Sequence, residues 1–108
     1  MPNILDHEAL GLTPIMGNRY YYCNDEGERV GIISLQDEGV HIAMYSIRSI
    51  TKGSGLGTRL VEKIKALAAD KGIPVVIDWV TPDAVPYWES MGFEISTEHR
   101  VISAKYVP

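Results

Sequence analysis

The sequence predicts a single α/β domain whose sheet mixes antiparallel and parallel strands. Three observations support this fold class: a hairpin-like stretch over residues 19–35, an amphipathic helix pattern over 56–71, and a nearly continuous apolar run over 74–80. With 108 residues the chain has the length of one small domain. We therefore expect one domain over residues 1–108, with an antiparallel meander followed by a βαβ unit.

The first half of the chain alternates between strand-like and turn-like segments. Residues 3–12 have the composition of a short helix, and glycine and proline then interrupt the pattern. Strands over 19–23 and 29–35 are expected to form a hairpin around the turn cluster at 24–27. After a second turn, a third strand is expected over residues 40–50.

The helix over residues 56–71 has the clearest pattern. Its apolar residues recur at helical spacing on one face: Leu56, Leu60, Ile64, Leu67 and Ala68. Gly72 fits the left-handed position after a helix end, and Pro74 prevents the helix from continuing. The apolar run that follows suits a central strand buried on both faces. This strand is expected to lie parallel to the one before the helix.

A second helix and one or two further strands complete the prediction. With Asp83 as the N-cap, Pro86 falls in the first turn, where its missing N–H costs little. The helix is expected to run to Met91 and stop at Gly92, and residues 94–106 read as strand.

Composition limits the functions to be considered. The net charge of −4 and the pI of about 5.2 argue against a nucleic-acid-binding surface, which usually needs a basic excess. The single cysteine, Cys23, excludes an internal disulfide and a metal cluster of the CxxC type. The chain shows neither a leader pattern nor an apolar run approaching membrane length, so we expect a cytoplasmic protein with no membrane or metal partner.

The run from Lys52 to Thr58 (Lys-Gly-Ser-Gly-Leu-Gly-Thr) lies between a predicted strand and a predicted helix. Its glycines allow backbone N–H groups to approach a ligand, and the helix N-terminus behind them favours negative charge. These features predict a phosphate site. The run lacks the Lys-Ser/Thr pair of a P-loop and the glycine spacing of a dinucleotide fingerprint.

The flanks of this run resemble the signature of the GNAT superfamily of acetyl-CoA-dependent N-acetyltransferases, roughly V-x-P-x-x-[RQ]-x-x-G-x-[GA]. Ile47 takes the valine place, Ser49 the proline place and Lys52 the Arg/Gln place, while Gly55 and Gly57 match the two glycines. Residues 84–93 are similar to the late family helix that closes with Tyr/Trp-x-x-x-Gly-Phe. The resemblance covers residues 19–106.

The resemblance implies a GNAT-like fold in which the two parallel strands splay apart, and acetyl-CoA as the cofactor. The amides of residues 53–58 would hold the pyrophosphate, and the strand at Ile47 would pair with the pantetheine arm. The implied cofactor-binding residues are Ile47, Lys52, Gly53, Ser54, Gly55, Leu56, Gly57, Thr58 and Trp88.

Acetyl transfer to an amine needs a base for the amine and an acid for the leaving thiolate. His41 and Asp78 are candidate bases, with Glu38 on the adjoining turn; Asp78 is expected to be buried, because it lies in an apolar run. Trp88 occupies the place where many family members carry a tyrosine acid, and indole gives up no proton in this range. Tyr87 is expected to point away around the helix, so Tyr45 or water is left as the acid.

The resemblance implies an N-acetyltransferase that modifies a primary amine by direct attack on the thioester. Eighteen residues precede Arg19, fewer than most family members have, so the acceptor side is expected to be open or completed by a second subunit of a homodimer. An open site favours a peptide or protein amine. The alternative is a non-catalytic acetyl-CoA-binding regulator of a partner protein.

Overall fold

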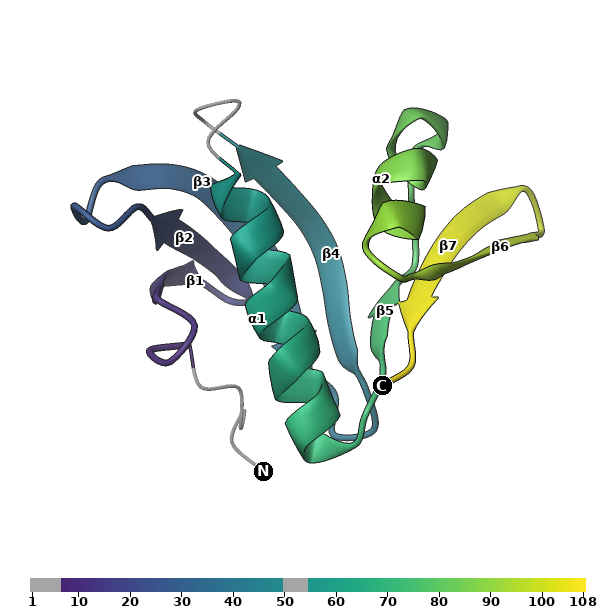
Figure 1. Ribbon diagram of the computed structural model, residues 1–108, viewed down its shortest axis with the longest axis horizontal. Coiled ribbons are helices and arrows are strands. Elements are labelled where there is room, and N and C mark those ends of the chain that lie inside the picture. Colours follow the sequence, from purple (N-terminus) through teal and green to yellow (C-terminus); the bar gives the residue numbers. More distant parts are fainter. Residues whose placement is uncertain (1–6, 50–54) are drawn as a thin grey trace.

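A computed structural model describes residues 7–49 and 55–108 and contains one seven-stranded sheet with helices packed against it (Figure 1). The elements are β1 (Leu12–Met16), β2 (Arg19–Cys23), β3 (Arg29–Asp37), β4 (Ile42–Ser49), α1 (Leu56–Lys71), β5 (Val75–Ile77), the 3₁₀ helix η1 (Pro82–Ala84), α2 (Val85–Ser90), β6 (Glu94–Glu98) and β7 (Val101–Tyr106). The strand order across the sheet is β1-β2-β3-β4-β5-β7-β6.

The sheet has the mixed topology that the sequence predicts. Strands β1 to β4 form an antiparallel meander, β4 and β5 are parallel, and β7 and β6 continue the sheet antiparallel to β5. The parallel contact is short, because only the pairs Ile42–Val75 and Ala43–Val76 join β4 to β5. Beyond these pairs the two strands diverge in a V (Figure 1), which confirms the splay that the resemblance implies.

Helix α1 has the bounds that the sequence predicts. Its buried residues are Leu60, Val61, Ile64 and Ala68, which form the core with strand residues such as Met44 and Val75. The helix ends at Gly72, which adopts a left-handed φ of 71°. The N–H of Ile73 reaches back to the carbonyl of Ala68 at 3.0 Å, as in a Schellman motif.

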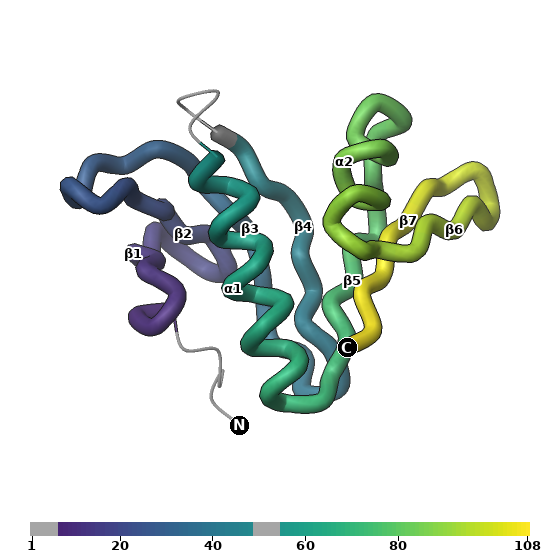
Figure 2. Tube along the Cα trace, in the orientation of Figure 1, coloured from purple at the N-terminus to yellow at the C-terminus, as the bar shows by residue number. Residues whose placement is uncertain are grey.

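Helix α2 lies across the V from α1, and the two helices stand on either side of the line along which β4 and β5 diverge (Figure 2). Trp88, Met91 and Phe93 belong to the same core as the buried face of α1. The Lys65 ammonium on α1 donates a 2.7 Å hydrogen bond to the Met91 carbonyl at the end of α2. The two helices therefore form one layer on the sheet.

Three sequence predictions about element bounds are wrong. Residues 7–11 of the expected N-terminal helix form a turn, and Leu12 already begins strand β1; the first six residues lie outside the described ranges. The predicted strand over 74–80 is only three residues long, Val75–Ile77. Asp83 does not cap α2, because a 3₁₀ helix that begins at Pro82 precedes it.

No helix within the described ranges is both long and apolar enough to cross a membrane.

Candidate functional site

A cleft of about 550 Å³ opens where β4 and β5 separate. Met44 and Ile47 of β4, Ile77 of β5 and Val80 give it an apolar lining. Met44 and Ile77 directly follow the two strand pairs that close the V, and Ala84, Tyr87 and Trp88 line the cleft from the helical segment. An extended ligand with an apolar middle section fits such a lining.

Tyr45 is the extra residue of a β-bulge in β4. Ser34 pairs with Ser46 and Leu35 pairs with Met44, which leaves Tyr45 without an opposite residue in β3. A bulge bends its strand and redirects a side chain. Here Tyr45 is 47% exposed while Met44 beside it is buried, and Tyr45 lines the cleft. The sequence indicates Tyr45 as a candidate acid but does not indicate the bulge.

The hydroxyl of Tyr45 donates a hydrogen bond of 3.3 Å to Oε1 of Glu38, on the turn between β3 and β4. Partial burial raises the pKa of the Tyr45 phenol above its usual value near 10, and the carboxylates of Glu38 and Asp78 add to this rise. The phenol is therefore protonated at neutral pH, as a proton donor must be.

Asp78 and His41 are not among the residues that line the cleft. The expectation that Asp78 is buried is wrong: β5 ends at Ile77, and the Asp78 side chain is exposed. His41 is half-buried on the turn before β4, and its carbonyl accepts the Glu38 N–H at 2.9 Å. Both residues are thus near the Glu38–Tyr45 pair. The charge of Asp78 acts on Tyr45, and the backbone of His41 is bonded to that of Glu38.

The N-terminus of α1 has features that suit an anion. Gly55 at the N-cap has a left-handed φ of 72°, and the first turn contains no acidic residue. The first intrahelical bond runs from the Arg59 N–H to the Gly55 carbonyl, so the helix offers no acceptor to the N–H groups of Gly57 and Thr58. N–H groups in this position at a helix N-terminus can bind a phosphate. The predicted residues Lys52, Gly53 and Ser54 lie outside the described residues.

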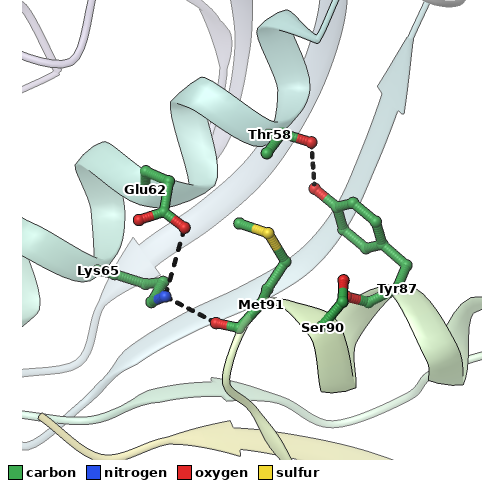
Figure 3. A network of polar contacts seen from close by, with 6 residues as sticks. All are labelled: Thr58, Glu62, Lys65, Tyr87, Ser90 and Met91. Carbon is green, nitrogen blue, oxygen red and sulfur yellow. Dashed lines mark hydrogen bonds and ion pairs between the residues drawn. The ribbon is translucent and has the colours of Figure 1, made fainter.

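Two polar contacts join α1 to α2 (Figure 3). The hydroxyls of Thr58 and Tyr87 lie 3.1 Å apart, and Lys65 binds the Met91 carbonyl. Tyr87 is 36% exposed whereas Trp88 is buried, as expected of neighbours around a helix, but both residues line the cleft. Helix α2 is only six residues long, and two of its residues, Tyr87 and Trp88, line the cleft.

Trp88 lines the cleft from within the core. Its indole is 6% exposed and packs edge to face against Phe93 at 5.1 Å between ring centres. Trp88 therefore packs in the core as well as lining the cleft. In the parts of the chain that the structure describes, no group of three or more His, Cys, Asp or Glu residues is placed to hold a metal ion.

Residues 9–104 match the family model of the GNAT acetyltransferase domain. A search of curated proteins finds no match. Among solved structures, the chain is similar to the anti-CRISPR protein AcrVA5, with 20% identity, a TM-score of 0.57, and coverage of 68% of this chain and 88% of that one.

Two N-acetyltransferases are also similar in structure. The PaiA N-acetyltransferase of Thermoplasma acidophilum, solved in complex with coenzyme A, has 11% identity and a TM-score of 0.67, with coverage of 83% of this chain and 60% of that one. The ribosomal-protein-S18-alanine N-acetyltransferase of Escherichia coli has 15% identity and a TM-score of 0.66, with coverage of 82% and 67%. The chain thus spans about three fifths to two thirds of these two enzymes.

Proposed function

Because this chain belongs to the GNAT family of acetyltransferases, which use acetyl-CoA, we propose that it transfers the acetyl group to a primary amine of a peptide or protein. The observation that supports this most directly is the open cleft between β4 and β5, with the bulge residue Tyr45 on its lining. The matched family covers residues 9–104 and so includes every element that forms the cleft.

The cleft and the N-terminus of α1 together suit the cofactor. The apolar lining from Met44 to Val80 would contact the pantetheine arm, and the N–H groups of Gly57 and Thr58 would hold phosphate oxygens. When bound, the cofactor supplies an activated thioester. The chain itself must orient the amine, take up its proton and protonate the departing thiolate.

We assign proton donation to Tyr45. The amine nitrogen forms a bond to the acetyl carbon as the C–S bond breaks. The Tyr45 hydroxyl would donate its proton to the departing sulfur. The proton that the amine releases would pass to a neighbouring base and from there reprotonate Tyr45. Glu38, Asp78 and His41 are the groups near Tyr45 that could accept the amine proton.

The acceptor side is open in the described chain. Tyr45 is 47% exposed and Trp79 is 76% exposed, although both line the cleft. This exposure supports a macromolecular acceptor, and a second copy of the chain could complete the site in a homodimer. The single cysteine, Cys23, suits the cytoplasmic location that we propose.

A thiol-release assay with acetyl-CoA tests the proposal. We expect turnover with peptides that carry a free amine and little turnover with aminoglycosides or polyamines. Tyr45→Phe should lower kcat with little change in the KM for acetyl-CoA, whereas Tyr21→Phe, outside the cleft lining, should leave kcat unchanged. Robust acetylation of small polyamines with none of peptides would contradict a peptide or protein acceptor.

A second candidate, a non-catalytic acetyl-CoA-binding regulator, is favoured by Trp88 at the place of the family's usual tyrosine acid. Calorimetry with coenzyme A distinguishes the two. Tight binding without turnover of any amine would support the regulator. Steady turnover that is lost in the Tyr45→Phe, Asp78→Asn and His41→Ala variants would exclude it.

A further inference from the structure

Trp79 is an exposed indole on a concave surface. It is 76% exposed and lines the cleft, whereas Trp88, on the same cleft, is 6% exposed. Indole rings usually bury most of their area, and tryptophan is enriched at interfaces, where one end of the side chain is in an apolar environment and the other is wet. The folded chain gains little packing energy from Trp79, so packing does not explain its position at the cleft.

Tyr45 lines the cleft from β4, and Trp79 lines it from the segment that follows β5. Asp78, the residue before Trp79, is close enough to Tyr45 for its charge to help raise the pKa of the phenol. The Tyr45 hydroxyl is bonded to the Glu38 carboxylate at 3.3 Å. Two aromatic rings with carboxylates close to them attract a cation, through the ring faces and through charge.

The charges around the cleft differ along β4. Arg48 is the one Lys or Arg among the described residues that line it, and it lies three residues beyond Tyr45 along β4, toward the N-terminus of α1. That end suits the phosphates of the cofactor. Glu38 and Asp78 lie near Tyr45, although neither lines the cleft. A cation therefore finds its favourable site at the Tyr45–Trp79 end.

We infer that Tyr45 and Trp79 form the acceptor subsite, and that the acceptor carries its amine as an ammonium on an aliphatic arm, as a lysine side chain does. The aromatic rings contact the arm, and the carboxylates of Glu38 and Asp78 attract the ammonium. This inference rests on the proposed function, because it names the acceptor of that same site. A free diamine has the same chemistry, so the test includes both sources.

Binding is tested without turnover by NMR of the two indole N–H groups. We expect N-α-acetyl-lysine amide to shift the Trp79 signal saturably and to leave the Trp88 signal in place. N-α-acetyl-norleucine amide has a similar arm without the charge and should cause no such shift. Equal shifts from both probes, or no shift of Trp79 from the lysine probe, would overturn the inference. Cadaverine is the diamine probe, and a stronger shift from it would keep the subsite but assign it to a small amine.

Kinetics provide the second readout. Trp79→Leu should raise the KM for a lysine-containing, N-terminally blocked peptide by about tenfold, with Trp79→Phe in between and the KM for acetyl-CoA unchanged. Met16→Ala changes a similarly exposed apolar residue on β1 and serves as the matched control. Turnover that is the same for Trp79→Leu and the unaltered protein would overturn the subsite and leave the proposed function standing. A Trp79 shift that depends on the lysine probe, without turnover of any amine, would support the subsite and overturn the proposed acetyl transfer.

Discussion

The hydroxyls of Thr58 and Tyr87 lie 3.1 Å apart and connect the first turn of α1 to α2 across the cleft side of the sheet. The two residues are 29 positions apart in the chain. Farther along α1, the Lys65–Met91 bond makes a second connection, at 2.7 Å. The first contact joins two exposed neutral groups and the second involves a mostly buried ammonium, so the first is the weaker of the two.

Removing either hydroxyl of this pair should have the same small effect. Tyr87→Phe and Thr58→Val should each lower the free energy of unfolding by about 0.5 kcal/mol, because water can replace an exposed partner. A double-mutant cycle by urea denaturation should give a coupling energy of similar size. Strictly additive losses would show that the two hydroxyls do not interact in solution.

The two tryptophans should differ sharply in their effect on stability. Trp88→Ala removes an indole packed against Phe93 and should cost about 3–5 kcal/mol. Trp79→Ala should cost no more than about 0.5 kcal/mol, because its side chain is exposed. Chemical denaturation of the two variants measures both values. Similar losses at the two positions would contradict the burial described here.

The ring of Tyr22 occupies the space that a side chain at Gly31 would fill. The two residues are paired across β2 and β3, and a Cβ on Gly31 would overlap the Tyr22 ring. The ring cannot move freely, because it is buried and its hydroxyl donates to the Arg48 carbonyl at 3.2 Å. Gly31→Ala should therefore cost about 1–3 kcal/mol. In a Tyr22→Ala background the same change should cost much less, and an unchanged cost would place the strain elsewhere.

Gly55 and Gly57 should respond differently to substitution. Gly55 has a φ of 72°, so Gly55→Ala should lower the free energy of unfolding by about 1–2 kcal/mol. A Cβ on Gly57 meets only ordinary contacts, the Tyr22 hydroxyl at 3.5 Å and Ile47 at 3.8 Å. Gly57→Val should thus keep the fold but weaken coenzyme A binding in calorimetry. Normal binding by that variant would mean that the phosphate cradle lies elsewhere.

The pH dependence of acetyl transfer should reveal Tyr45. Its raised pKa keeps the phenol protonated until above about pH 10, so activity should decline on that alkaline side as the donor is lost. The free energy of unfolding should depend on pH in the same direction. The contribution of the protonated Tyr45 phenol is present below the unfolded-state pKa and is lost as the pH rises through the higher folded-state pKa. The profile of Tyr45→Phe should be lower and lack this decline. An unchanged profile would exclude Tyr45 as the donor.

Local patterns predicted the features that local geometry controls. The bounds of α1 follow from apolar spacing and from Gly72, which forms the left-handed cap itself. The antiparallel meander and the parallel strands followed from element order. Features that depend on the register between distant strands were not predictable, among them the Tyr45 bulge and the Thr58–Tyr87 contact.

Two of the wrong predictions, the strand over 74–80 and the burial of Asp78, have a common physical origin in the segment after β5. The apolar sequence from 74 to 80 predicts one buried strand, but an apolar residue can also be exposed at a site. Trp79 is such a residue, and Asp78 beside it is exposed with it. Composition alone does not distinguish a buried strand from a short strand followed by a ligand-facing segment.

Among the described residues, the early separation of β4 from β5 gives the sheet inner edges besides its two outer ones. Strands β1 and β6 are the outer edges; the inner ones are the side of β4 that faces β5 beyond Ala43 and a single residue of β5, which ends at Ile77. Open edges invite another chain to add a strand and begin aggregation. The two contacts between α1 and α2 hold a helix on each side of the inner edges. Variants that break both contacts should therefore be screened for self-association as well as for activity.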